Sequence, residues 1–328
     1  MKKPWETFSA VGELYEPELK RTVKEWVLLM QGLNKCDWYL KSGGCTMCGF
    51  NGPASAKEEY AWLTKYFGRS ALDAMYWFGY FGIRHQRPER LTIYNGGNFL
   101  NSGLEVPGSK PEIPFSLQTA ICRHVGRHPT IEKLFVETKA SFITEKNIPI
   151  LKECIGRKTL QVGIGFESVD DRVRDKLLKK GTTRFEFEKK VDILKKNGVR
   201  SFAYVFLKPV GLSEREAIDD AVNTIAYCFA KGIDEVSLSC AFIQEGTEMC
   251  EAYRIGAYKP PTLWSIIEVV KRTASLGPVR VGTFEDEPPP IDVPKNCPEC
   301  TGTVNAALDR YRCSFDPAVF DGLDCPCR

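Results

Sequence analysis

The chain has 328 residues, of which 43% are hydrophobic and 27% charged, and its net charge is +3. These proportions are typical of a folded globular protein and exclude an intrinsically disordered chain. The length suits one α/β barrel with a small appendage. Because net charge alone does not reveal a clustered basic face, the composition leaves a nucleic-acid partner open.

The N-terminus, residues 1–6, lacks the apolar stretch of a signal peptide. No run in the sequence approaches the roughly 18 consecutive apolar residues that a membrane span needs. The sequence therefore predicts a cytoplasmic protein that does not bind a membrane.

Through the middle of the chain, short runs of β-branched and aromatic residues alternate with longer amphipathic stretches, which is typical of βα units in a parallel sheet. Strands are predicted over residues 26–31, 91–94, 134–137, 160–166, 201–207 and 235–242, with 279–282 as a candidate seventh. Helices are predicted over residues 114–127, 144–155, 170–178, 185–197, 214–231 and 262–275. Ser213 stands where an N-cap belongs, and Gly198 and Gly232 stand where C-caps belong.

Six strands with crossover helices predict an α/β fold, a partial (β/α)6 TIM-like barrel with its functional residues at the C-terminal ends of the strands. After Phe284 the sequence becomes acidic and proline-rich over residues 285–290, as in an extended linker. We therefore expect a barrel core of residues 1–284, followed by a linker and a small Cys-rich metal-binding tail of residues 285–328.

Thirteen cysteines are many for a cytoplasmic chain, where thiols serve as metal ligands or buried apolar groups more often than as disulfides. Cys36, Cys45 and Cys48 follow the first predicted strand with C-x8-C-x2-C spacing. Three thiolates can hold a 4Fe-4S cluster and leave one iron without a protein ligand. The alternative is a zinc site or three unrelated cysteines, but a structural zinc site needs four ligands, and His85 is the nearest further candidate.

The sequence resembles the radical S-adenosylmethionine (SAM) superfamily, in the branch that contains the Elongator catalytic subunit and the archaeosine synthase radical SAM subunit. The resemblance covers most of the chain and is most specific in residues 44–50 (Gly-Cys-Thr-Met-Cys-Gly-Phe), 206–209 (Phe-Leu-Lys-Pro), 213–220 (Ser-Glu-Arg-Glu-Ala-Ile-Asp-Asp) and 258–265 (Tyr-Lys-Pro-Pro-Thr-Leu-Trp-Ser). It implies that SAM binds to the open iron through its amino and carboxylate groups and is cleaved to a 5'-deoxyadenosyl radical.

The same resemblance implies a substrate and partners. The archaeosine branch acts on a lysine-bearing 7-deazaguanine in tRNA and cleaves a C-N bond. We therefore expect a tRNA-modifying lyase that receives electrons from a donor such as flavodoxin or ferredoxin, together with a partner enzyme that supplies the modified substrate.

The resemblance also implies cofactor-binding residues at the ends of the strands. Gly96, Gly97 and Asn98 follow the second predicted strand, where the superfamily has a glycine-rich turn that meets the SAM amino group, although an ordinary Asn-Gly turn is the alternative. Phe50 ends the cysteine motif, and Lys208 lies in the Phe-Leu-Lys-Pro segment.

Three more cofactor-binding candidates follow the third and fourth predicted strands. Glu137 and Lys139 resemble a Val-Glu-Ser-Arg pattern, in which Lys139 replaces an arginine that would meet the SAM carboxylate, and lysine lacks the bidentate geometry of arginine. Glu167 lies in a Gly-Ile-Gly-Phe-Glu-Ser segment that would flank the SAM adenine or the substrate. A solvated lysine and a carboxylate at a helix start are the respective alternatives.

The last 32 residues contain five cysteines, Cys297, Cys300, Cys313, Cys325 and Cys327. A Cys-x2-Cys knuckle and a second close pair can complete a tetrahedral zinc site and fold a segment that has little apolar mass. The resemblance supports Cys297, Cys300, Cys325 and Cys327 as the ligands, with Cys313 spare. An auxiliary 4Fe-4S cluster that recruits Cys313 is the alternative, since such ligand sets suit both metals.

Two further functions stay open on the sequence. After the sixth strand, where the archaeosine family has an Asn-Pro turn and a basic residue, this chain has Gln244 and Glu245. This departure favours a radical SAM enzyme that acts on a small nucleoside or natural-product precursor. The other alternative is a non-catalytic iron-sulfur or zinc protein that binds RNA or a partner.

Overall fold

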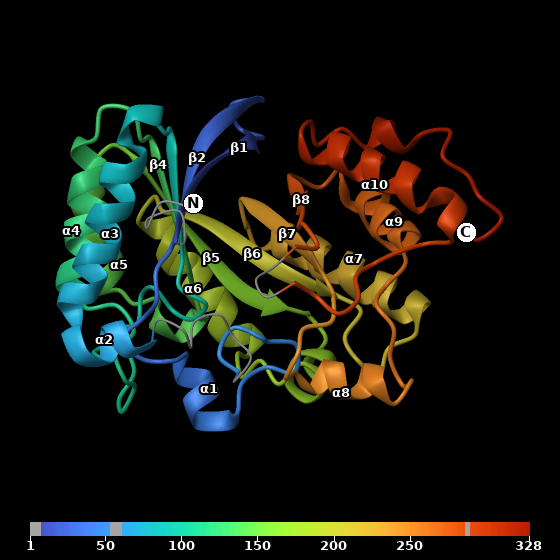
Figure 1. Ribbon diagram of the computed structural model, residues 1–328, viewed down its shortest axis with the longest axis horizontal. Coiled ribbons are helices and arrows are strands. Elements are labelled where there is room, and N and C mark those ends of the chain that lie inside the picture. The colour runs from blue at the N-terminus through green and yellow to red at the C-terminus, as the bar shows by residue number, and fades with distance from the viewer. Residues whose placement is uncertain (1–7, 53–60, 286–288) are drawn as a thin grey trace.

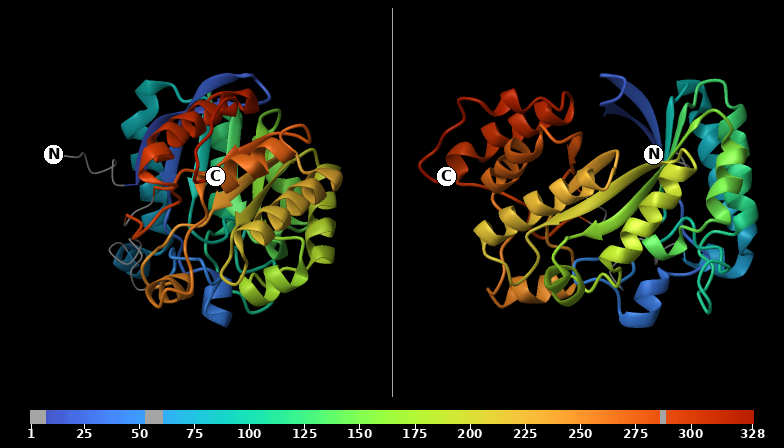
Figure 2. Two further views of the ribbon diagram at one scale, coloured as in Figure 1. Left: turned by 90° about the vertical axis from the view of Figure 1, so that its right-hand side faces the viewer. Right: turned by 180° about the vertical axis from the view of Figure 1, so that it is seen from behind.

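The computed structural model describes residues 8–52, 61–285 and 289–328, and its centre is a curled sheet with helices over its outer face (Figures 1 and 2). The eight strands lie side by side in sequence order, β1 pairs antiparallel with β2, and all later pairs are parallel. The strands are β1 Ser9–Glu16, β2 Arg21–Leu29, β3 Arg90–Tyr94, β4 Lys133–Thr138, β5 Thr159–Glu167, β6 Arg200–Leu207, β7 Glu235–Cys240 and β8 Val279–Val281. The predicted partial barrel is confirmed, including the candidate seventh strand.

The helices follow the strands as crossover connections. They are α1 Asp37–Ser42, α2 Ala61–Phe67, α3 Arg69–Ile83, α4 Phe115–Arg127, α5 Asn147–Ile155, α6 Arg184–Lys196, α7 Glu214–Ala230, α8 Glu248–Arg254, α9 Leu263–Thr273 and α10 Pro298–Arg312. Four shorter helices complete the set, η3 Arg84–Gln86, η4 Ala140–Phe142, η5 Val173–Leu177 and η6 Pro317–Phe320. Five of the six predicted helices correspond to α4, α5, α6, α7 and α9. The helix predicted over residues 170–178 is mainly the π-helix η5, where the guanidinium of the buried Arg174 bonds to the Thr182 and Ser168 carbonyls at 2.5 and 3.2 Å.

Alternation along the strands sorts their side chains between the two faces of the sheet. On β3, Leu91 and Ile93 are fully buried in the hydrophobic core beneath the helices, whereas Arg90 and Thr92 point to the inner face of the barrel. There Arg90 pairs with Glu16 and Lys133 pairs with the same carboxylate at 2.6 Å. This buried charge network fills the N-terminal end of the barrel, so that its C-terminal end is left for a site.

The C-terminal segment packs against the open side of the sheet. Tyr311 on α10 donates a hydrogen bond to the Val279 carbonyl on β8 at 2.7 Å, and Phe315 stacks on Tyr15 of β1 with ring centroids 5.7 Å apart. Arg280 on β8 also donates to the Tyr15 carbonyl at 3.1 Å. The tail thus bridges the two edge strands of the barrel, beside α9 and β8 in Figure 1.

Two expectations involve residues outside the described ranges. Residues 286–288 of the proposed linker and the N-terminal residues 1–6 both lie there, so the division at residue 285 stays a prediction. Val304 and Leu308 of the tail belong to the same hydrophobic cluster as the barrel strands. Among the described helices, none is long and apolar enough to cross a membrane.

Candidate functional site

The three N-terminal cysteines lie at the C-terminal end of the sheet, around the short helix α1. Cys36 immediately precedes α1, which ends at Gly43 and Gly44, both with positive φ, and Cys45 and Cys48 form the next turn. The Cys48 amide donates to the Cys45 carbonyl at 3.1 Å. The three thiols interact electrostatically with one another, and burial raises the pKa of Cys36 and that of Cys45, the latter to about 12. Partly buried thiols that repel one another as thiolates fit a positively charged metal group, which would stabilise the ionised form.

Asn51 joins the cysteine loop to the glycine turn after β3. Its side-chain oxygen accepts a hydrogen bond from the Cys36 amide at 2.9 Å, and its side-chain nitrogen donates to the Gly96 carbonyl at 2.8 Å. Phe50, a predicted cofactor-binding residue, is 46% exposed beside it. The structure therefore brings together two groups that the sequence places about 60 residues apart.

Glu112 is a site residue that sequence reasoning missed. It is 1% exposed, and its carboxylate accepts hydrogen bonds from the Asn98 amide and side chain, each at 2.6 Å, and from the Asn101 side chain at 3.0 Å. Burial raises the pKa of Glu112, whereas the donors from Asn98 and Asn101 act in the opposite direction. The available signal was slight, a single acidic residue between two prolines in a loop.

Gly97 lies directly against this carboxylate. A Cβ at Gly97 would stand 2.0 Å from Glu112 Oε2, and Gly96 has a φ of +54°. The turn therefore requires glycine because the protein's own buried carboxylate approaches the backbone there. This reason differs from the expected one, which was room for a ligand.

A second missed residue, Lys180, lies beside the cysteines. Its ammonium group forms an ion pair with Glu167 at 2.7 Å, and its positive charge opposes the raised pKa of Cys45. The segment around Lys180 is held on the cysteine loop, since the Trp38 indole donates to the Lys179 carbonyl at 2.7 Å. The sequence carried no signal for this lysine, because its partners come from distant segments.

Lys139 also contacts Trp38 of the cysteine loop. Its ammonium group is 4.1 Å from the centroid of the Trp38 ring, and its backbone amide donates to the Asn98 side chain at 2.7 Å. Burial lowers the pKa of Lys139. Two lysines from different loops therefore bring positive charge to the cysteine loop.

Glu137 faces the inside of the barrel. The Tyr204 hydroxyl on β6 donates to its carboxylate, and burial raises the pKa of Tyr204. On the neighbouring strand a Cβ at Gly163 would stand 2.8 Å from the Phe135 ring and 3.1 Å from the Tyr204 ring. Glycine at that position therefore leaves space on the inner face for the rings of Phe135 and Tyr204.

Lys208 lies in a different group. It pairs with Glu214 at the start of α7 and also donates to the Pro260 carbonyl at 3.4 Å, while the Tyr258 hydroxyl donates to the Lys208 carbonyl at 2.6 Å. The structure therefore places Lys208 in a junction between β6, α7 and the segment before α9.

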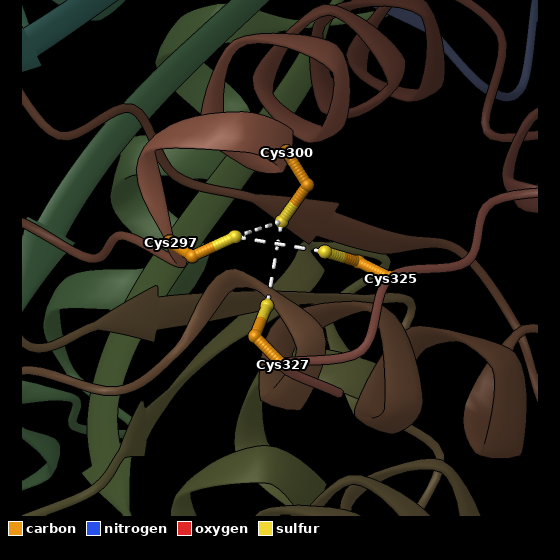
Figure 3. A group of neighbouring side chains, drawn as sticks. All are labelled: Cys297, Cys300, Cys325 and Cys327. Carbon is orange, nitrogen blue, oxygen red and sulfur yellow. Dashed lines mark hydrogen bonds between the residues drawn. The ribbon is translucent and has the colours of Figure 1, made fainter.

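Four of the five tail cysteines converge (Figure 3). The Sγ atoms of Cys297, Cys300, Cys325 and Cys327 lie within 4.8 Å of one another, and three of the pairs are 3.5–3.6 Å apart. Four thiolates around one zinc ion, with Zn–S bonds of about 2.3 Å, would be about 3.8 Å apart. Cys313 is exposed at the end of α10 and lies outside the group.

Donors from the barrel reach this tail site. The Trp264 indole of α9 donates to the Cys327 sulfur at 3.4 Å, and together with a backbone hydrogen bond at Cys297, which has the larger effect, it lowers the pKa of Cys327 to about 6. The Asn296 side-chain oxygen accepts a hydrogen bond from the backbone amide of Leu263 at 2.9 Å. The four thiols are thus fixed to the N-terminus of α9, an arrangement that fits a closed structural metal site.

Two curated proteins are similar to the chain over most of its length. It is 29% identical to archaeosine synthase subunit beta of Methanosarcina acetivorans over 303 residues. This alignment covers 89% of this chain and 80% of the relative. It is 27% identical to archaeosine synthase subunit beta of Thermococcus kodakarensis over 251 residues. This alignment covers 74% of this chain and 72% of the relative. The chain is similar to archaeosine synthase subunit beta over most of its length.

The solved structures that align with the chain are more distant in sequence. Elp3 of Methanocaldococcus infernus aligns with a TM-score of 0.48 at 16% identity. The alignment covers 78% of this chain and 61% of the Elp3 chain, which is less than two thirds. Methylornithine synthase aligns with a TM-score of 0.48 at 11% identity, covering 80% of this chain and 65% of that one. No family model matches the sequence.

Proposed function

We propose that Cys36, Cys45 and Cys48 hold a 4Fe-4S cluster on which SAM binds. The clustering of the three thiols at the C-terminal end of the barrel, where parallel α/β folds carry their sites, supports this assignment. When bound, the cluster and SAM supply the 5'-deoxyadenosyl radical. The role of the chain is to bind both groups, to orient them and to exclude water.

The residues around the cysteine loop suit the methionine end of SAM. Lys180 and Lys139 bring positive charge that would attract a carboxylate. Lysine serves as a point charge there without the bidentate geometry of arginine. In our proposal Glu167 fixes the Lys180 ammonium group.

We propose a 7-deazaguanine nucleotide in tRNA as the substrate, with C–N bond cleavage as the reaction. The observation that carries this proposal is the similarity to archaeosine synthase subunit beta over 89% of the chain. An electron donor such as flavodoxin or ferredoxin and a partner enzyme that supplies the modified tRNA belong to the same proposal.

Exposed aromatic side chains on α2 support an RNA substrate. Trp62, Tyr66 and Phe67 are exposed on a helix at the same end of the molecule as α1, and Lys65 lies 5.9 Å from the centroid of the Tyr66 ring (Figure 1). Exposed aromatic rings with adjacent cations are the groups on which unpaired bases stack.

Gln244 and Glu245 still support the alternative of a small nucleoside or natural-product precursor. A Cβ at Gly49 would stand 2.6 Å from the Gln244 side chain, so Gln244 lies against the cysteine loop. Glu245 pairs with Arg254 at 2.7 Å on the surface. Because Arg254 compensates the charge of Glu245, this carboxylate is a weaker argument against tRNA than the sequence alone implied.

For the tail we propose one zinc ion on Cys297, Cys300, Cys325 and Cys327. Their short sulfur–sulfur distances support a single tetrahedral ion, since a 4Fe-4S cube would hold its four thiolates farther apart. The position of Cys313 outside the group supports the same choice.

An anaerobic assay with reductant and SAM tests the proposed chemistry. We expect 5'-deoxyadenosine to form, and its absence from protein that has bound iron would indicate a non-catalytic metal protein.

Filter binding of tRNA at increasing salt tests the substrate, since phosphate contacts give a steep salt dependence. We expect the Trp62→Ala/Tyr66→Ala/Phe67→Ala variant to bind tRNA more weakly and Phe185→Ala, an exposed aromatic of α6, to bind normally. Absence of tRNA binding by the wild-type protein would favour the small-molecule alternative.

A further inference from the structure

The contacts of Asn98 determine how its side-chain amide is oriented. The backbone amide of Lys139 can only donate, and it donates to Asn98 Oδ1 at 2.7 Å. In the orientation that this donor requires, Asn98 Nδ2 donates to the Glu112 carboxylate at 2.6 Å. The Lys139 donor excludes the flipped amide. The second hydrogen of Nδ2 is left for the Cys36 sulfur, which lies 3.5 Å away.

Glu112 holds Asn98 at a second point as well. The other carboxylate oxygen accepts the backbone amide of Asn98 at 2.6 Å, so the carboxylate binds both the main chain and the side chain of this residue. The Glu112 carboxylate also accepts a hydrogen bond from the backbone amide of Asp37, the residue after Cys36, at 3.3 Å. A single buried group thus fixes the donor and the acceptor of the Asn98–Cys36 contact relative to each other.

We propose that Glu112 is a positioning residue which, through Asn98, fixes an N–H···S hydrogen bond on Cys36 and thereby raises the reduction potential of the bound cluster. The inference rests on the proposed function, since it requires a cluster on Cys36, Cys45 and Cys48. Hydrogen bonds to cluster sulfurs stabilise the more negative reduced state and so favour reduction. The readiness of the cluster to accept an electron is therefore set partly by a residue that ligates no metal.

The charge of Glu112 acts in the opposite direction. A buried anion beside Cys36 disfavours additional negative charge there. Glu112→Gln therefore has two effects, since it removes the charge and places an amide NH2 group against donors that need an acceptor. A double-mutant cycle with Asn98 separates the two effects.

The experiment measures the midpoint potential of the cluster by redox titration with electron paramagnetic resonance detection. The proteins are the wild type, Asn98→Ala, Glu112→Gln and the double variant, each with its iron content determined. We expect Asn98→Ala to shift the potential to a more negative value. We compare the shift in potential that Glu112→Gln causes in the wild type with the shift that it causes in the Asn98→Ala variant. The shift should be more negative in the wild type, because in the Asn98→Ala variant only the loss of charge remains. Equal shifts in the two backgrounds would overturn the proposal, because Glu112 would then act by its charge alone.

Asn101→Ala is the matched control, since Asn101 donates to the same carboxylate but has no hydrogen bond to the Cys36 sulfur. We expect its potential to stay near that of the wild type, and a shift as large as that of Asn98→Ala would contradict a specific hydrogen bond. If Glu112→Gln does not assemble a cluster, Asn98→Ala still decides, because an unchanged potential at full iron content contradicts the proposal. Wild-type protein without iron would contradict the proposed function instead.

Discussion

Lys208 and Glu214 form an ion pair that joins the end of β6 to the start of α7. The Glu214 carboxylate also accepts the Thr262 amide at 2.7 Å and the Ser265 hydroxyl at 2.5 Å, so it holds the N-terminus of α9. Three of the segments that most resemble the archaeosine branch, 206–209, 213–220 and 258–265, therefore meet at one carboxylate. Their shared role is to connect the barrel with the helix that carries Trp264 to the tail cysteines.

Glu214→Gln should lower the free energy of unfolding by about 1–3 kcal/mol at neutral pH, because it leaves the largely buried Lys208 ammonium group without its anionic partner. Burial acts to raise the pKa of Glu214, but hydrogen bonds from Lys208, Ser265 and Thr262 outweigh it, and the pKa is lowered. The contribution is therefore complete above about pH 4.3, the usual pKa of glutamate, and is lost as the pH falls through the lower folded-state value.

Urea unfolding of the wild type and Glu214→Gln between pH 7 and pH 3 measures this effect. The difference between the two proteins should shrink toward the acidic end of the range. Glu248→Gln is the control, since its pair with Lys179 is exposed and should contribute little. A difference that does not depend on pH would contradict the assignment to the ionised Glu214 carboxylate.

Cys36→Ala, Cys45→Ala and Cys48→Ala should each abolish reductive SAM cleavage, because the cluster loses one of its three thiolate ligands. Liquid chromatography of 5'-deoxyadenosine after anaerobic incubation with dithionite measures the loss. Cys154→Ala, a half-buried cysteine of α5, should retain the activity of the wild type. Product formation by any of the three loop variants would refute the ligand assignment.

Gly97→Val should weaken SAM binding by at least about tenfold, because the added carbons displace the Glu112 carboxylate and with it the turn. Equilibrium dialysis with labelled SAM measures the affinity. Gly12→Ala in β1 is the control, since a Cβ there meets no atom within 4 Å. Unchanged affinity in Gly97→Val would show that the turn has no part in the SAM site.

Cys327→Ser should remove the zinc ion and leave the iron content unchanged. Metal analysis of anaerobically purified wild-type protein should give about four irons and one zinc per chain. Cys313→Ser should keep both metals, because the Cys313 thiol lies outside the tail group. About eight irons and no zinc in the wild type would establish an auxiliary cluster in place of the zinc ion.

The barrel strands could be predicted because their signal is local. Leu91–Ile93 and Val162–Ile164 are short β-branched or aliphatic runs that are fully buried in the structure. β1 escaped prediction because much of its residues 9–16 is polar or partly exposed. Helix α3 was not predicted because its own aromatic residues are spread around the helix and several of them are exposed. The sequence therefore shows no single apolar stripe.

The cysteine ligands could be proposed from the sequence, because residue type and spacing alone indicate a metal site. Glu112 and Lys180 could not, because neither has a distinctive neighbourhood in the sequence. The importance of Glu112 arises from its hydrogen bonds with Asn98, and that of Lys180 from its electrostatic interaction with Cys45, which the fold brings near it. Lys208 was assigned to the cofactor on its motif, and its partner Glu214 lies in another part of the fold from the cysteine loop.

The contact between Tyr15 and Phe315 joins β1, near the beginning of the chain, to the segment after α10, near its end. The Arg280–Tyr15 hydrogen bond spans 265 residues in the same place. On a ribosome these contacts cannot form until residues 280 and 315 have emerged, so the edge of β1 stays unprotected while the intervening barrel is synthesised. Contacts between such distant segments make folding slow, and an unpaired strand edge is prone to aggregation. Expression at low temperature or with chaperones should therefore increase the yield of soluble protein.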